Sequence, residues 1–293
     1  MTTALINAKI LLQVGDGLKF IFSFLQKTMS KTVLITGASQ GSGKATALLF
    51  ARKGYNVVLA ARSTDKLESA AVEVRNLDGS ALAITTDVTD FQQVEYLVQK
   101  ALEFYDNIDI LVNNAGICLT GPVEKMTLED WQNIINTNLW GYVHTIHLLL
   151  PHFLQRNCGT IVNVGSFGGK MPLPEMTAYC ASKYAVTGLT ESLRLELAKT
   201  NIHVSGVHPG MINSDFLDRA EFRGKNQAEI DKRRQQMTQM LQSSIVTQPE
   251  DIAKAIWEAV SHQQTDVVVG PAVVATEAYR FFPGLVQFIM ERN

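Results

Sequence analysis

The chain has 293 residues, of which 46% are hydrophobic and 18% are charged, and its formal net charge is −2 at pH 7. This composition indicates a folded protein that is long enough to bury a sizeable core, and it excludes an intrinsically disordered chain. The near-neutral charge argues against a nucleic-acid-binding protein. The cysteines Cys118, Cys158 and Cys180 are odd in number and widely spaced, so we expect no disulfide framework, no metal site and a cytoplasmic protein.

Residues 1–28 differ from the rest of the chain because their apolar residues recur at helical intervals. Lys9, Asp16 and Lys19 leave no apolar run near the ~20 residues that a bilayer span needs, and no signal-peptide pattern is present. Two interpretations stay open: an amphipathic helix on the protein or on a membrane surface, or an extension upstream of a start at Met29. We favour a dispensable extension.

From Lys31 onwards, short apolar runs alternate with longer amphipathic segments. The apolar runs predict strands over residues 32–36, 56–60, 80–85, 108–112, 160–164, 203–207 and 266–270. The amphipathic segments predict helices over residues 45–53, 66–76, 91–104, 131–153, 179–199 and 249–261. Strict alternation with continuous apolar strands predicts an α/β fold in which helices cover both faces of a parallel sheet. We expect one doubly wound domain over residues 29–275.

A glycine-rich turn, Thr36-Gly37-Ala38-Ser39-Gln40-Gly41-Ser42-Gly43, joins the first predicted strand to the first helix. Glycines at this point let the backbone turn sharply and approach a pyrophosphate, whose charge the helix N-terminus stabilises. The spacing is Gly-x3-Gly-x-Gly and not the commoner Gly-x-Gly-x-x-Gly. The turn therefore predicts a nucleotide site that includes Gly37, Ser39, Gln40, Gly41, Ser42 and Gly43.

The second predicted strand ends at Arg62 and Ser63, where an acidic residue would bind the ribose 2′-hydroxyl of NAD. No acidic residue stands there. The planar guanidinium of Arg62 suits a phosphate, and Ser63 offers a further donor, which favours NADP(H). A solvated arginine after a strand is the alternative.

Polar residues also follow the third and fourth predicted strands. Asp87 and Val88 come after one strand, and Asn113-Asn114-Ala115-Gly116 after the next. Ligands of parallel sheets bind at these carboxyl ends, although asparagines in such places also stabilise loops.

Tyr179 and Lys183 stand four residues apart at the start of a predicted helix. Positions i and i+4 share one face of a helix, so the phenol and the ammonium should point to the same place. A cation beside a phenol favours the ionised form and would make Tyr179 a usable acid or base. Taken alone, the pair is more typical of a tyrosine and a lysine on a helix surface.

Together with Asn138, Ser166 and Pro209-Gly210, these motifs resemble the classical short-chain dehydrogenase/reductase family and its NADP-preferring subgroup. The matches occur in the order and at the spacing of the family, from Lys31 to about Gly270. The resemblance implies a Rossmann-type sheet of seven parallel strands, nicotinamide chemistry, and a homodimer or homotetramer.

The resemblance also implies roles for four side chains. Tyr179 corresponds to the general acid/base, and Ser166 to the group that binds the substrate oxygen. Lys183 would bind the ribose of the nicotinamide and hold the phenol partly ionised. Asn138, an unfavourable residue in the middle of a predicted helix, would keep a water in a proton relay.

Further residues are expected at the cofactor by the same resemblance. Asp87 would contact the adenine, Asn114 would line the cofactor path, and Arg62 would select NADP. The implied set is completed by Ser63, Val88, Ala115, Gly116, Tyr179, Lys183, Pro209, Gly210, Ile212 and Ser214. Ser42 replaces the usual isoleucine of the family and should loosen apolar packing, and Ser214 replaces the usual threonine.

The sequence is less informative about the substrate than about the cofactor. Residues 211–248 lie where the family has its variable lid, and their Met and other apolar residues favour a lipophilic carbonyl or alcohol, unless they only pack the lid onto the sheet. Their cations either dock an acyl carrier or coenzyme A or, as we favour, form a solvated helix face. The apolar tail, residues 276–293, is expected to cover the pocket, pack on a partner subunit or touch a membrane, in that order.

The sequence thus predicts an NADP(H)-dependent oxidoreductase that interconverts a carbonyl and an alcohol on a small, lipophilic substrate. An NAD-linked alcohol dehydrogenase of the same family is the first alternative. A cofactor-binding sensor or scaffold without catalysis is the second.

Overall fold

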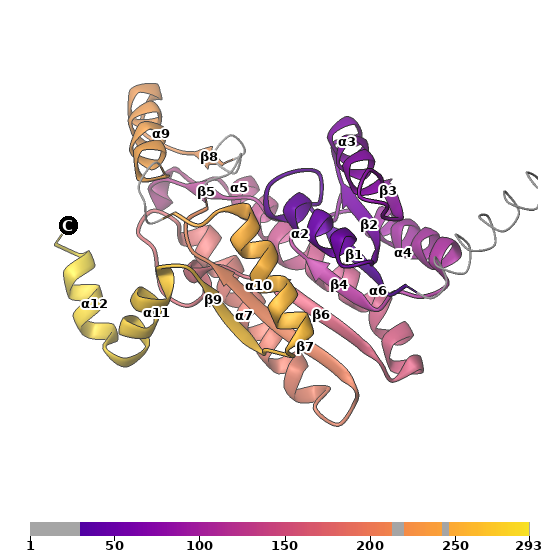
Figure 1. The fold of residues 1–293 in the computed structure, drawn as a ribbon. Helices are drawn as coiled ribbons and strands as arrows, with labels where there is room; N and C mark the ends of the chain where they lie inside the picture. Colours follow the sequence, from indigo (N-terminus) through magenta and orange to yellow (C-terminus); the bar gives the residue numbers. More distant parts are fainter. Residues whose placement is uncertain (1–29, 213–219, 242–245, 293) are drawn as a thin grey trace, which may run out of the picture.

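A parallel sheet of seven strands forms the centre of the computed structural model, which describes residues 30–212, 220–241 and 246–292 (Figure 1). The strand order is β3-β2-β1-β4-β6-β7-β9. The predicted doubly wound α/β fold with seven parallel strands is therefore confirmed. The strands are β1 (Thr32–Thr36), β2 (Asn56–Ala61), β3 (Ala81–Thr85), β4 (Ile110–Asn113), β6 (Gly159–Val164), β7 (Ile202–Pro209) and β9 (Asp266–Val269).

Helices cover both faces of the sheet because successive side chains of each strand point to opposite sides. In β1, Val33 and Ile35 pack into one hydrophobic cluster, whereas Leu34 packs into the cluster on the other face. The first face carries α2 (Gly41–Arg52), α3 (Thr64–Arg75) and α10 (Pro249–Ser261). The second face carries α4 (Phe91–Tyr105), α6 (Gly141–Arg156) and α7 (Thr177–Glu196).

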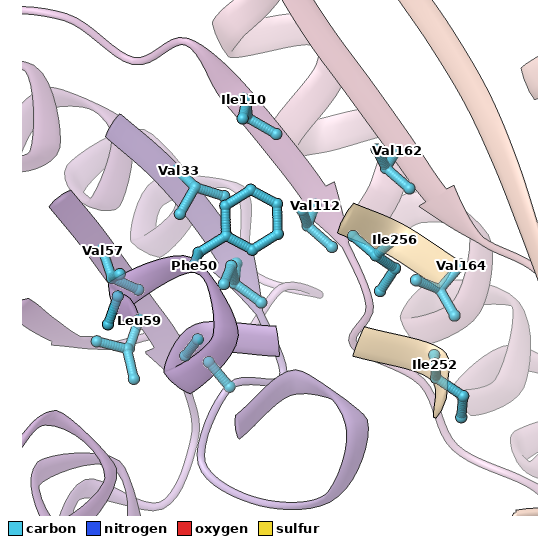
Figure 2. Packing of buried hydrophobic residues seen from close by; sticks show 14 of the residues in the cluster. Val33, Phe50, Val57, Leu59, Ile110, Val112, Val162, Val164, Ile252 and Ile256 are labelled. Atoms are coloured by element: carbon cyan, nitrogen blue, oxygen red, sulfur yellow. The ribbon is translucent and has the colours of Figure 1, made fainter. Parts of the chain in front are cut away.

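Phe50 of α2 is the centre of the first cluster and lies over the side chains of β1, β2 and β4 (Figure 2). Its ring is fully buried and meets the ring of Trp257 on α10 edge-on, with 5.3 Å between the centroids. Such aromatic pairs contribute about 1 kcal/mol beyond the area that they bury. The contact joins α2, at whose N-terminus the glycine-rich turn lies, to a helix from the far end of the chain.

The strand order reverses between β1 and β4. β1 pairs with β2 on one side and with β4 on the other, so the connections after β1 and β4 leave the sheet in opposite directions. In doubly wound sheets, a crevice opens at this switch point beside the carboxyl ends of the strands. The fold therefore places the loops after β1 and β4 on either side of one crevice.

The prediction of one long helix over residues 131–153 is wrong. The segment instead forms α5 (Leu128–Ile135), a π-helical turn η2 (Asn136–Trp140) and then α6. The buried side chain of Asn138 forms hydrogen bonds with the backbone of Ile117 and with Ser182, and these bonds hold the wider turn in place. Single π turns of this kind are frequent at functional sites.

Helix α2 begins at Gly41, four residues before the predicted start, because the last two glycines of the glycine-rich turn form its first helical turn. Further elements escaped prediction. They are the short strands β5 (Leu119–Thr120) and β8 (Glu221–Phe222), the 3-10 turns η1 (Val123–Lys125) and η3 (Phe167–Gly169), and the helices α9 (Gln227–Leu241), α11 (Ala272–Phe281) and α12 (Pro283–Met290).

Helices α11 and α12 contain the apolar tail and extend away from the sheet (Figure 1). Phe281, Phe282 and Leu285 are each more than half exposed, and α12 has no buried residue. Within the described ranges, no helix is both long and apolar enough to cross a bilayer. The extension predicted over residues 1–28 lies outside the described residues.

Substitution by alanine should change the free energy of unfolding in opposite directions at Gly43 and Gly188. A Cβ on Gly43 would overlap the carbonyl oxygen of Gly37 and lie 2.6 Å from Asn114 Nδ2. Gly43→Ala should therefore lower the free energy of unfolding by about 2 kcal/mol or more. A Cβ on Gly188, in the middle of α7, would meet nothing within 4 Å. Gly188→Ala should raise the free energy of unfolding by about 1 kcal/mol, and urea denaturation of both variants checks the pair.

Candidate active site

The glycine-rich turn lies on one side of the crevice at the switch point. Gly37 and Gly41 have φ angles of 66° and 56°, a left-handed conformation that favours glycine. Because Gly43 also has no room for a side chain, α2 begins close to the end of β1, and Gly37, Gln40 and Ser42 of the turn line the crevice. A helix N-terminus with this approach is suited to bind phosphate groups.

Asn114 connects the turn to the loop after β4. Its side chain donates to the carbonyl oxygen of Thr36 at 3.0 Å, and its backbone N–H donates to Thr36 Oγ1 at 3.0 Å. Ser42 Oγ donates to Asn114 Oδ1 at 2.8 Å. The serine thus makes a polar contact between the two loops, and the expected loosening of apolar packing is not what this position shows.

One end of the crevice is a cavity of about 380 Å³ beside the ends of β2 and β3. Arg62 and Ser63, which follow β2, and Asp87 and Val88, which follow β3, line this cavity as expected. Lys66 also lines this cavity and was missed, because a charged residue in the first turn of an exposed helix has no local signal that distinguishes it from a solvated one. Its Nζ donates to Gln40 Oε1 at 3.0 Å, so a second cation lies at this end.

A second cavity, of about 470 Å³, continues from the first, and the two share residues of the loops after β1 and β4. Ser166, Tyr179 and Lys183 line it together with Pro209, Gly210 and Ile212. The remaining wall is mostly apolar. It includes Cys118, Phe167, Leu173, Met176, Met211, Ala220, Phe222, Met237 and Leu241.

Tyr179 and Lys183 point inward from α7 and are only 7% and 4% exposed. This burial rules out the alternative of a surface pair. Ser166 follows β6, and its hydroxyl lies close enough to the Tyr179 phenol to lower the pKa of that phenol. Ser166 Oγ also accepts a hydrogen bond of 3.1 Å from the backbone N–H of Gly168, which orients the hydroxyl at the cavity wall.

The pKa of Tyr179 lies above its usual value, which differs from the expectation that Lys183 would hold the phenol partly ionised. Burial is the main cause because it disfavours the phenolate, the nearby Cys118 adds to the rise, and the hydrogen bond from Ser166 opposes it. Lys183 Nζ donates instead to the carbonyl oxygen of Val164 at 3.0 Å. The phenol is therefore protonated near neutral pH.

Burial also lowers the pKa of Lys183, to about 8. The ammonium has few compensating partners among the described residues, since its Nζ contacts the Val164 carbonyl and lies 5.5 Å from the centre of the Tyr142 ring. An amine with this pKa gains or loses its proton readily near physiological pH.

Asn138 lies behind the wall of the cavity and does not line it. Its Oδ1 accepts from the Ile117 N–H at 2.9 Å, and its Nδ2 donates to the Ile117 carbonyl and to Ser182 Oγ, each at 3.0 Å. A Cβ on Gly116 would lie 3.3 Å from Asn138 Oδ1 and 3.6 Å from Lys183 Nζ, so both groups approach this glycine. The water relay through Asn138 stays a prediction.

Two arginines of the lid, residues 211–248, form ion pairs with carboxylates outside the lid. Arg223 binds the buried carboxylate of Asp130 through two nitrogens, and its hydrogen bonds hold the pKa of Asp130 below the usual range. Arg233 of α9 forms ion pairs with Glu175 and Glu229. These two cations are thus engaged within the protein, whereas Lys225, Lys232 and Arg234 are exposed.

Three predicted residues contribute from behind the cavity walls, namely Gly41, Gly43 and Asn138, and Ser214 lies outside the described residues. Of the lid residues expected to be apolar contacts, Met211, Ile212, Phe222, Met237 and Leu241 line the cavity. No residue of α11 or α12 lines either cavity, so the described part of the tail does not cover the pocket.

A doubly wound sheet with a glycine-lined crevice at its switch point is typical of nucleotide-binding proteins. Comparison with known proteins narrows this class. Residues 31–223 match the model of the family described as short chain dehydrogenase. The chain belongs to the short-chain dehydrogenase/reductase family of oxidoreductases.

Similar proteins include 3-oxoacyl-acyl-carrier-protein reductases. The enzyme of Thermotoga maritima is 40% identical over 189 residues, which are 64% of this chain and 77% of the relative. The enzyme of Staphylococcus aureus is 34% identical over 229 residues, which are 78% of this chain and 89% of the relative.

Solved structures agree with this membership. A short-chain dehydrogenase/reductase from Burkholderia phymatum in complex with NAD superposes with a TM-score of 0.80 at 28% identity, covering 89% of this chain and 96% of that one. Actinorhodin polyketide ketoreductase with NADPH gives a TM-score of 0.70 at 28% identity, covering 82% and 95%. A 3-ketoacyl-(acyl-carrier-protein) reductase from Brucella melitensis with NADH gives 0.72 at 30% identity, covering 82% and 96%.

Burial of Lys183 predicts a pH-dependent stability. Its pKa is about 8 in the folded protein, below the ~10.4 of an unfolded chain, so the unfolded state binds more protons between these pH values. The contribution of Lys183 to the free energy of unfolding therefore rises with pH in this window. Lys183→Met should be more stable than the wild type by on the order of 2 kcal/mol at pH 7, and most of this advantage should be gone at pH 10.

Urea denaturation at both pH values measures this difference. Lys254→Met is the control, because the side chain of Lys254 is 72% exposed and its removal should change stability equally at both. If the advantage of Lys183→Met stayed constant from pH 7 to pH 10, burial would not lower the pKa of Lys183, and the prediction would be wrong.

Proposed function

We propose that the protein is an NADPH-dependent reductase that converts a carbonyl group of a lipophilic substrate to an alcohol. One observation carries this proposal. The hydroxyls of Ser166 and Tyr179 both line the wall where the glycine-lined crevice opens into the apolar cavity. A substrate carbonyl at this junction would meet two hydroxyl donors on one side and the cofactor crevice on the other.

The crevice fits a dinucleotide. A Cβ on Gly37 or Gly43 would overlap atoms of the turn or of the loop after β4, so the glycines keep the two loops close together, and the N-terminus of α2 lies at the crevice where a pyrophosphate would bind. Arg62 and Lys66 put two cations beside the predicted position of the ribose 2′-phosphate. The solved relatives hold NAD, NADH or NADPH, so the preference for NADPH depends on these two side chains.

The nicotinamide, when bound, supplies the hydride. Ser166 and Tyr179 would hold the carbonyl oxygen, and Tyr179 would give its proton to the oxygen as the alcohol forms. This direction suits a phenol whose pKa burial has raised, because the phenol is then protonated at neutral pH. Lys183, with a pKa of about 8, would return a proton to Tyr179, with Asn138 holding a water behind it.

The substrate class follows from the wall of the larger cavity. Met211, Phe222 and Met237 close it with flexible or aromatic apolar surface, which suits an acyl or polyketide chain better than a sugar. The relatives named above act on 3-oxoacyl groups, in which a ketone stands at the third carbon of such a chain. A 3-oxoacyl thioester is therefore our first choice of substrate.

Replacement of Tyr179 by phenylalanine should lower kcat by about 10³-fold and leave NADPH binding unchanged, since only the proton donor is removed. Turnover of acetoacetyl-coenzyme A and fluorescence titration with NADPH measure the two quantities. Tyr184→Phe is the matched control, because Tyr184 follows on the same helix but is 41% exposed, and it should keep full activity. Retained activity in Tyr179→Phe would refute the proposed role.

The double variant Arg62→Ala, Lys66→Ala should raise the Kd for NADPH by about 10–100-fold, because charged hydrogen bonds to a phosphate are lost. The Kd for NADH should change less than about three-fold. Arg75→Ala at the other end of α3 is the control and should affect neither. An equal loss of NADPH and NADH binding in the double variant would instead support the NAD-linked alternative.

A cofactor-binding sensor without catalysis is the remaining alternative. Oxidation of NADPH with aliphatic, steroid-like, retinoid-like and acyl-thioester carbonyls tests it, since a sensor would bind NADPH tightly and turn over none of them. Homodimers or homotetramers remain the expected assembly of a family member.

A further inference from the structure

A cluster of charged and polar side chains lies outside both cavities, on the face of the sheet that α7 covers. His208 of β7 contacts Asp266 at the start of β9, with 2.8 Å between Nε2 and Oδ1. Lys170 Nζ lies 3.0 Å from the same carboxylate oxygen and 3.1 Å from the other one. Lys170 also reaches Glu191 of α7 at 3.3 Å.

The imidazole of His208 is almost fully buried and occupies space left by two glycines. A Cβ on Gly206 would lie 2.7 Å from His208 Nε2, and a Cβ on Gly165 would overlap Nδ1 and lie 2.8 Å from Cε1. Among the described residues, His208 Nδ1 has no hydrogen-bond partner, and the polar contact of the ring is that of Nε2 with Asp266. The ring therefore packs directly against the residue that precedes Ser166.

The segment from Gly165 to Lys170 is held at both ends by this cluster. At its start, the Gly165 N–H donates to the Val207 carbonyl at 2.7 Å beside the His208 ring. At its end, Lys170 binds the carboxylate that His208 also binds. On the opposite side, Thr187 of α7 donates to the Gly169 carbonyl at 3.2 Å. Ser166 lies inside this closed set of contacts.

We propose that Lys170, Asp266 and His208 are positioning residues for the reaction, and that they act by holding the Ser166 hydroxyl at the substrate carbonyl. This inference rests on the proposed function, because it assumes that Ser166 binds the substrate oxygen. Asp266 links the two ends of the segment, and a displacement of Ser166 by about 1 Å would be enough to reduce turnover strongly.

The charge state of Asp266 supports a contact with Lys170 and His208 that is present throughout the neutral pH range. Burial alone would raise the pKa of this carboxyl, but the hydrogen bonds and charges of His208 and Lys170 hold it at about 2. The carboxylate is therefore charged throughout the neutral range, and the ion pair with Lys170 persists there.

A double-mutant cycle tests whether Asp266 acts through Ser166. With acetoacetyl-coenzyme A and NADPH, Asp266→Asn should lower kcat about ten-fold and leave the Kd for NADPH within two-fold. Ser166→Ala should lower kcat about 100-fold, and the double variant should lose no more than Ser166→Ala alone. Multiplied losses in the double variant, or full kcat in Asp266→Asn, would overturn the inference. Full kcat in Ser166→Ala would instead refute the proposed role of that serine.

Lys170 provides an independent variant at the other end of the segment, should Asp266→Asn fail to fold. Lys170→Met should lower kcat about ten-fold, and the conservative Lys170→Arg should restore it to within about three-fold of the wild type. Equal activity of Lys170→Met and the wild type would overturn the inference.

Hydrogen exchange needs no substrate, so it tests the positioning role of Asp266 and Lys170 even if acetoacetyl-coenzyme A is not turned over. The amides of Gly168, Gly169 and Lys170 should exchange about ten-fold faster in Asp266→Asn and in Lys170→Met. Asp109→Asn is the matched control, because Asp109 is an ion-paired carboxylate that directly precedes the central strand β4 and is bound to Arg156 at 2.8 Å. Unchanged exchange in both test variants would contradict the proposal.

Discussion

The hydrogen bonds between Thr36 and Asn114 are the contact on which the rest of the site depends. They join the loops after β1 and β4 at the point where the strand order reverses, and Ser42 adds a third bond to the same amide. A switch point without such bonds would leave two independent loops. With them, the glycine-rich turn and the loop before Gly116 form two walls of one crevice at a fixed separation.

Burial decides the chemistry at the other end of the crevice. Tyr179 and Lys183 are both buried. Burial raises the pKa of Tyr179 and lowers the pKa of Lys183, so it favours the neutral form of each side chain. Helix geometry alone brings a phenol and an ammonium to one face, but it does not reveal that the ammonium donates its hydrogen bond to the Val164 carbonyl. The site therefore holds a neutral phenol and an amine whose pKa is about 8, rather than an ionised phenol beside a fixed cation.

Strands were predicted well because most of them are short apolar runs and the central ones, β1, β2 and β4, are buried on both faces, and such runs carry their own signal in the sequence. The helix over residues 131–153 was misread for the opposite reason. Its division at η2 depends on hydrogen bonds from Asn138 to Ile117 and Ser182, which are 21 and 44 residues away. Lys66 was overlooked because a charged residue on an exposed helix has no local signal that separates it from a solvated one.

The sequence by itself determined the fold class, the glycine-rich turn, and the identity of the residues that now surround the crevice. These properties depend on local pattern and spacing, which any alternating α/β chain displays directly. Only the tertiary structure decided which side chains contact one another across the sheet, how deeply Tyr179 and Lys183 are buried, and that His208, Asp266 and Lys170 enclose the segment of Ser166. Such contacts join residues far apart in the chain, and their energies depend on distance and exclusion of water, neither of which spacing along the sequence expresses.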